Sequence, residues 1–138
     1  MASTPYSARL ESSLLIRLRR LSARDRIPVS QLVERYLEEA VRAEEFPGIV
    51  FRSGPAGRRA GVVAGPDVWE IVRDVEAAAQ AGVTDPLRHV LDTTDLGEEQ
   101  VRLALAYRAA FPEEVDRHVI YLLLDIAYGI IDPRVRTG

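Results

Sequence analysis

Few side chains in this sequence could do chemistry, and most of them are arginines and acids. The chain has no cysteine, which excludes disulfides, thiolate metal sites and cysteine nucleophiles. His89 lies four residues after Asp85 and three before Asp92, so these three side chains could share a helix face and hold a metal ion. His118 follows Glu114 by four residues in the same way. Two histidines among 21 acids produce such spacings by chance, and no nucleophile accompanies them. We therefore predict no enzyme, no metal site and no cofactor.

Charge is divided unevenly along the chain. Residues 1–43 hold eight arginines against five acids, a net charge of +3, and residues 44–138 hold ten against sixteen, a net charge of −6. All 18 basic residues are arginines, which bind phosphate and guanine in bidentate fashion better than lysine does. A basic first part suits nucleic acid, and the acidic remainder would be repelled by it. The charge division predicts two domains, at 1–43 and 44–138.

The first part begins with a short alternating segment and continues with two helical patterns. In Tyr6-Ser7-Ala8-Arg9-Leu10, the apolar residues share one face of a strand and Ser7 and Arg9 share the other. A leucine stripe from Leu14 to Leu21 predicts a helix, and a second helix is expected to open near Ser30. A lone strand and two leucine-rich helices cannot close a core, so we predict a dimer in which two strands pair antiparallel above four helices.

This pattern resembles the ribbon-helix-helix family of DNA-binding proteins, the CopG, Arc and MetJ kind. The resemblance covers Pro5 to about Ala43 and includes the Ser30-Gln31-Leu32-Val33 opening of the second helix. The sequence departs from the family at Arg26, where a glycine is usual, and at Pro28, where a polar cap is usual. The resemblance implies that Ser7 and Arg9 read bases in the major groove. It also implies that the backbone at Val29 and Ser30 holds phosphate, while the charge of Arg26 suits phosphate contact.

The second part begins with a predicted hairpin and continues with helices. Two β-prone runs, at 49–52 and 58–63, flank a turn rich in glycine and proline. Helices are predicted from Asp67, from Asp85 and from Glu98, with Asp67 as a cap. Trp69 can stack on Arg73, which lies one helical turn later. The segment 119–131 is almost entirely apolar but too short for a membrane span, so it is a buried helix or an interface.

Residues from Phe46 to His118 resemble a small three-helical domain of unknown function found in VapB-type antitoxins. The Pro112-Glu113-Glu114-Val115-Asp116 segment is its most specific piece. The resemblance implies a toxin partner, plausibly a PIN-type nuclease. Apolar residues beyond one core face of the last segment then become candidates for partner binding: Tyr121, Leu124 and Tyr128.

The expected fold is mostly helical, with an N-terminal ribbon-helix-helix followed by a hairpin and a three-helix, helix-turn-helix-like domain that ends in an apolar helix. The expected protein is a cytoplasmic, dimeric DNA-binding repressor of its own operator and the antitoxin of a type II toxin–antitoxin pair. Two alternatives stay open. One is an ordinary dimeric regulator whose second domain senses a ligand or mediates oligomerisation, and the other is a small hydrolase or metal-binding protein.

Overall fold

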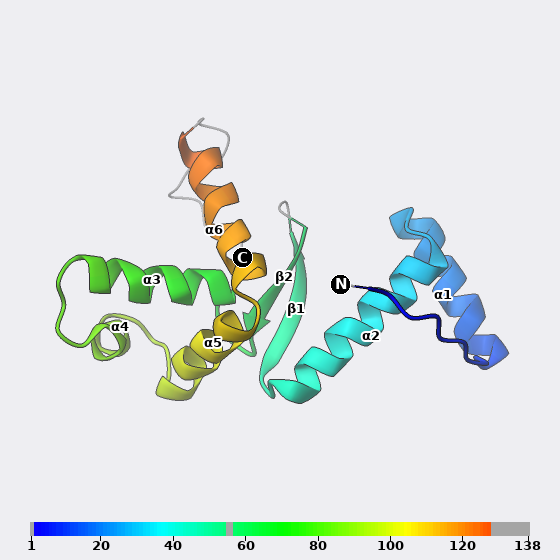
Figure 1. Cartoon of the computed structure of the whole chain (residues 1–138), viewed down its shortest axis with the longest axis horizontal. Coiled ribbons are helices and arrows are strands. Elements are labelled where there is room, and N and C mark those ends of the chain that lie inside the picture. Colours follow the sequence, from blue (N-terminus) through cyan, green and yellow to red (C-terminus); the bar gives the residue numbers. More distant parts are fainter. Residues whose placement is uncertain (1, 55–56, 128–138) are drawn as a thin grey trace. The chain divides into compact units, whose positions relative to one another are not determined.

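The structure is a computed structural model that describes residues 2–54 and 57–127, with side chains described as far as Val119. The described residues are mostly helical and include one short two-stranded ribbon (Figure 1). In chain order the elements are α1 (Ser12–Asp25), α2 (Val29–Glu45), β1 (Ile49–Gly54), β2 (Gly57–Val62), α3 (Val68–Gln80), α4 (Pro86–Thr93), α5 (Glu98–Ala110) and α6 (Pro112–Ala127). The predicted fold class is confirmed at this level. No helix of the described residues is long and apolar enough to cross a membrane.

The chain divides into two compact units, Met1–Val41 and Arg42–Gly138. The first unit contains α1 and nearly all of α2, joined by a tight turn. Arg26 ends α1 in the left-handed conformation, with φ 54° and ψ 42°. The N–H of Ile27 returns to the carbonyl of Ser22 at 3.1 Å, and the Ser22 hydroxyl donates to the carbonyl of Ile27 at 2.6 Å. Glycine is the usual residue at a helix ending of this kind, and here an arginine occupies the position.

Residues 2–11 have no regular secondary structure, so the first element of the chain is a helix. The strand expected over residues 6–10 is not formed in the single chain. No backbone hydrogen bond of the described residues involves these five positions. The physical reason is that a strand exists only through pairing, and one copy offers this segment no neighbouring strand. The ribbon-helix-helix order and the dimer therefore stay predictions.

The second unit has its core between the hairpin and the helices that follow. β1 and β2 pair antiparallel in a register that sets Ile49 opposite Val62, as expected for a hairpin in this region. α3 packs against α4, α5, α6 and β2, and α4 lies at the end of α3 away from the hairpin (Figure 1). The buried core is drawn from every element of the unit: Ile49, Ala60, Val62, Val68, Ile71, Val72, Val90, Val101, Ala104, Tyr107 and Val115.

The helix starts in this unit follow local capping rules. The backbone N–H of Asp67 donates to the Glu70 carboxylate at 3.0 Å at the start of α3. The Asp85 carboxylate accepts from the N–H of Arg88 at 3.1 Å at the start of α4. Because these contacts join residues three apart, the sequence alone could place the beginnings of both helices.

The left-handed arginine generates a prediction about stability. Replacing Arg26 by glycine should stabilise the first unit by about 0.5–1 kcal/mol, since glycine adopts a positive φ without the steric cost of a Cβ. Urea unfolding followed by circular dichroism measures the change. Ala23→Gly, on the exposed interior of α1, is the control and should lower stability by about 1 kcal/mol. Equal destabilisation by both substitutions would contradict the assigned turn.

Candidate functional site

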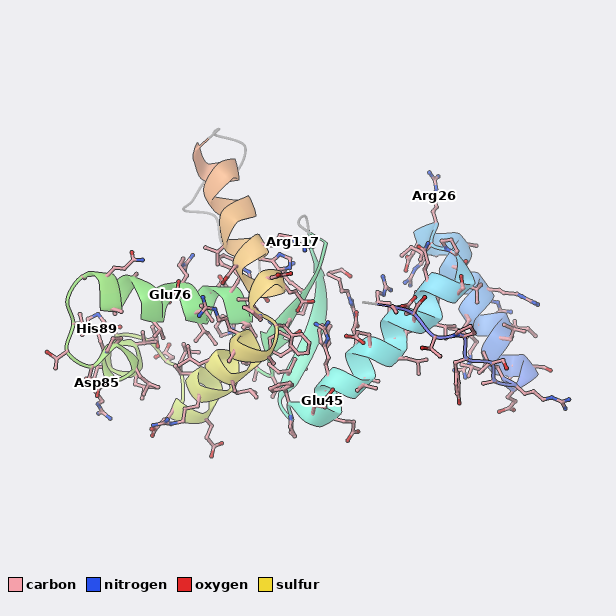
Figure 2. All side chains as sticks on the ribbon, in the orientation of Figure 1. Arg26, Glu45, Glu76, Asp85, His89 and Arg117 are labelled. Atoms are coloured by element: carbon pink, nitrogen blue, oxygen red, sulfur yellow. The ribbon has the colours of Figure 1, made fainter. Side chains whose placement is uncertain are left out.

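The predicted DNA-binding residues all lie in the first unit, but the single chain does not assemble them into one surface. Ser7 and Arg9 are exposed in the segment without secondary structure. Arg26 is exposed at the α1–α2 turn, and its side chain extends away from both helices (Figure 2). Val29 and Ser30 are the first two residues of α2.

The start of α2 leaves backbone donors uncommitted. The carbonyl of Pro28 accepts the first helical hydrogen bond, from the N–H of Leu32 at 3.0 Å, so Pro28 occupies the cap position. Proline has no side-chain acceptor to offer the first N–H groups of the helix. None of the backbone hydrogen bonds found in the described residues uses the N–H of Val29 or Ser30. These two donors can therefore meet an anion such as a phosphate.

The first unit also leaves much apolar surface in water. Only Leu18 and Leu32 are buried within it, whereas Tyr6 is 88% exposed and Leu37 is 57% exposed. An open groove of about 400 Å³ lies between the helices, and it is lined by three leucines, two arginines and Tyr36. Six of the seven large apolar side chains that are exposed in the described residues belong to this unit: Tyr6, Leu10, Leu14, Ile16, Leu37 and Val41.

The most connected polar group of the second unit is Asp67, which lies at the start of α3 and is only 5% exposed. Arg52 and Arg59 are paired residues of the hairpin, and two like charges facing each other across strands are unfavourable. The negative charge of Asp67 compensates the positive charges of both arginines. One oxygen accepts from Arg52 at 3.0 Å, and the other accepts from Arg59 and from the indole N–H of Trp69, the latter at 3.2 Å.

Two glycines make room for this arrangement. A Cβ placed on Gly54 would overlap the guanidinium group of Arg59, and a Cβ on Gly61 would overlap that of Arg52. Arg59 cannot move aside cheaply, because it is buried and bound to Asp67. β1 and β2 thus form the predicted hairpin, and Gly54 leaves room for the side chain of Arg59.

A second polar centre surrounds the hydroxyl of Tyr107, whose ring is fully buried. Arg42 donates to that hydroxyl at 2.8 Å and to both oxygens of Glu114 at 2.8 and 2.9 Å, and the hydroxyl itself donates to Glu114 at 2.7 Å. Burial, followed by the hydrogen bond to Glu114, raises the pKa of Tyr107 well above its ordinary value. The guanidinium group of Arg42 also lies 3.8 Å from the centre of the Phe111 ring. A neutral tyrosine that only donates and accepts fits a structural role.

Neither histidine belongs to a cluster of possible metal ligands within the described part of the chain. Asp85 caps α4 and Asp92 pairs with Arg88 at 3.2 Å, while His89 is exposed. Among the described residues, no three histidine, aspartate or glutamate side chains lie close enough to hold a metal ion. Burial lowers the pKa of His118 below its ordinary 6.5, although the Glu114 carboxylate opposes this shift.

The predicted partner-binding residues belong to the last part of the chain. Tyr121 and Leu124 are within α6, but their side chains lie outside the described residues. Tyr128 lies outside the described residues altogether. Their role stays a prediction from the sequence.

Sequence reasoning missed both polar centres of the second unit. Asp67 was expected only as a helix cap. Arg42 and Tyr107 were not singled out, and Glu114 was considered only beside His118 and in the Pro112–Asp116 segment. One available signal was the pair of arginines at 52 and 59, one in each predicted strand, which the observed register brings opposite each other. The stacking of Arg73 on Trp69 was predicted and is present, with 5.2 Å between the guanidinium carbon and the ring centre.

Comparisons with known proteins give no family for this chain. No protein-family model matches it, and no curated protein or solved structure matches it at a significant level. Its assignment to a functional class therefore depends on its own residues and geometry.

The buried Asp67 centre generates the next prediction. Asp67→Asn should destabilise the second unit by about 3 kcal/mol, because two closely placed arginines would lose their only negative partner in this centre. Urea unfolding followed by the fluorescence of Trp69 measures the effect. Asp74→Asn is the matched control on the same helix, since Asp74 pairs with Arg73 in solvent and its removal should change stability by about 0.5 kcal/mol or less. Similar small changes in both variants would refute the central role of Asp67.

Proposed function

We propose that this protein is a dimeric DNA-binding repressor of its own operator and the antitoxin of a type II toxin–antitoxin pair. The first unit binds double-stranded DNA as a homodimer, and the second unit holds the toxin, a PIN-type ribonuclease. The DNA-binding part of this proposal rests on the apolar surface of the first unit. This unit has the apolar composition of a core, but only two of its leucines are buried.

A second copy would relieve three unfavourable features of the first unit at once. It would cover the exposed leucines and the groove between the helices. It would also give residues 6–10 a strand to pair with, and so satisfy their backbone groups. In that pairing Tyr6, Ala8 and Leu10 turn inward, which leaves Ser7 and Arg9 on the outer face of a two-stranded ribbon that fits the major groove.

The remaining DNA contacts follow from charge and from helix geometry. The N–H groups of Val29 and Ser30, which the Pro28 cap leaves unbound, suit a phosphate at the positive end of α2. Arg26 extends from the adjacent turn and suits a neighbouring phosphate. Residues 1–43 carry +3 overall, which supports contact with a polyanion.

The antitoxin part rests on the resemblance of residues 46–118 to the VapB-associated domain, together with charge. Residues 44–138 carry −6, which suits the basic surface of an enzyme that binds RNA. The apolar segment from 119 to 131 offers more apolar side chains than one core face needs. Tyr121, Leu124 and Tyr128 are the residues proposed to contact the toxin.

One observation favours a second candidate function, a regulator whose second unit senses a small molecule. A pocket of about 590 Å³ lies in this unit, within the size range of small-molecule sites. The two functions differ in the partner that should accompany the protein from its native host, a nuclease in the first case and a small ligand in the second.

The dimer is tested by charging its expected interface. The full chain should sediment as a dimer at micromolar concentration, and Leu37→Glu should shift it to monomer. Each buried leucine contributes about 2 kcal/mol, and a twofold interface counts the change twice. Gln31→Glu, which adds the same charge about 120° around the same helix at an exposed position, should leave the dimer intact. A folded monomer in the unmodified chain would overturn the assignment of the first unit.

Substitutions of two arginines distinguish base reading from phosphate binding. Arg9→Ala should weaken binding to the specific operator by about 1–3 kcal/mol and relax its sequence preference, if its contact is bidentate to guanine. Arg26→Ala should weaken binding to all sequences alike and flatten the salt dependence. Fluorescence anisotropy with operator and scrambled duplexes at several salt concentrations measures both effects. Equal, small losses on both duplexes for Arg9→Ala would exclude base reading by the ribbon.

The antitoxin role is tested in cells. A chain of residues 1–43 should still bind the operator but should no longer protect cells from the toxin encoded beside it. Leu124→Asp in the full chain should abolish co-purification of the toxin while the melting temperature holds. Unchanged co-purification would remove this face of α6 from the interface, and a full chain that never co-purifies with a nuclease would favour the ligand-sensing regulator.

A further inference from the structure

The hairpin of the second unit has one edge that is closed and one that is open. Beyond β2, the N–H of Val62 donates to the carbonyl of Pro66 at 3.0 Å, and Gly61 forms a bridge with Asp67. α3 and α5 also pack against β2. No strand or bridge of the described residues pairs along the outer edge of β1. An open edge of this kind is a template for another strand.

The register of the hairpin fixes which backbone groups of β1 point outward. The N–H of Val63 donates to the carbonyl of Gly48 at 2.8 Å, so these two residues form a hydrogen-bonded pair. Such pairs recur at every second residue of an antiparallel ladder. The N–H and C=O groups of Ile49, Phe51 and Ser53 therefore face away from β2.

One of these outward groups is already bonded within the chain. The N–H of Ile49 donates to the carbonyl of Phe46 at 3.0 Å. Outside the β1–β2 ladder, none of the backbone hydrogen bonds found in the described residues uses the N–H of Phe51 or Ser53. These two donors are left to water or to another chain. β1 carries β-branched and aromatic residues and no proline that would protect its edge.

A second copy of the same edge complements it in one register above the others. When two β1 strands pair antiparallel about a twofold axis at Phe51, the two Phe51 residues exchange hydrogen bonds. The N–H of each Ser53 then meets the carbonyl of Ile49 in the other copy, so both free donors are used. An axis at Arg52 would keep as many bonds, but it would set two arginines directly opposite each other. With the axis at Phe51, Arg52 lies opposite Val50.

Charge favours the same arrangement. Arg58 is exposed near the tip of the hairpin and donates to the hydroxyl of Ser53 at 3.0 Å, so its guanidinium group lies toward the edge of β1. Glu44 and Glu45 are exposed at the end of α2, a few residues before β1 begins (Figure 2). Antiparallel pairing places the tip of one hairpin beside the start of the other. The arginine of each copy therefore comes near the acids of the other copy.

We propose that the second unit associates with a second copy of itself through the outer edge of β1, so that two hairpins form one four-stranded antiparallel sheet. The contact is small and residues 44–138 of each copy carry −6, so association is expected only well above micromolar concentration. All of the residues involved belong to the second unit. The association is therefore independent of the dimer proposed for the first unit and of the antitoxin role.

The association is tested by sedimentation of the full chain carrying Leu37→Glu, from micromolar concentration up to about 1 mM. Whatever species this chain forms at low concentration, its mass should double at high concentration, so the result does not depend on the first unit. Ser53→Pro should abolish the doubling, because proline removes an N–H that the β1–β2 ladder does not use. Ser53→Ala keeps that N–H and should associate like its parent. The fluorescence of Trp69 during melting checks that both variants are folded.

An exchange of charges tests the register without changing the backbone. Arg58→Glu and Glu45→Arg should each weaken association by about fivefold, and the double variant should restore it, because opposite charges then meet again across the twofold axis. The proposal is overturned if the mass does not rise with concentration, or if Ser53→Pro associates as Ser53→Ala does. It is also overturned if the double variant associates no better than the single variants.

Discussion

The arrangement of the second unit depends on one carboxylate. The hairpin places Arg52 directly opposite Arg59, and without Asp67 the two positive charges would repel each other beside a low-dielectric core. With Asp67, the same contact ties both strands to the start of α3 and orients Trp69. Gly54 and Gly61 are part of the same arrangement, because each guanidinium group occupies the space that a Cβ at one of these glycines would fill.

The two units differ in how far they bury their apolar side chains. The second closes a core with residues from its hairpin and from all four of its helices, and sets a buried tyrosine among aromatic rings. The first buries only Leu18 and Leu32 and leaves comparable leucines in water. A unit of this size rarely stabilises itself alone, and in the proposed dimer two copies would share one core.

The local features of this fold could be predicted from sequence, and the long-range ones could not. Helix starts at Asp67 and Asp85 follow from contacts three residues apart, and the stacking of Arg73 on Trp69 follows from one helical turn. The partners of Asp67 are 8 and 15 residues distant, across a hairpin whose register the sequence leaves open. The strand expected at residues 6–10 is not formed in the single chain, because its hydrogen bonds depend on a neighbouring strand that one copy does not contain.

The link between Arg42 and Glu114 has a consequence for how the chain folds. These residues are 72 positions apart, and the phenylalanines that surround Tyr107 come from positions 46, 51 and 111. During synthesis the hairpin and α3 emerge well before α5 and α6. The apolar faces of the hairpin and α3 therefore stay exposed until α6 has been synthesised. Contacts between residues so far apart in sequence form only after a long loop has closed, so they form late. The part of the second unit that is synthesised first therefore depends for its burial on the part that is synthesised last.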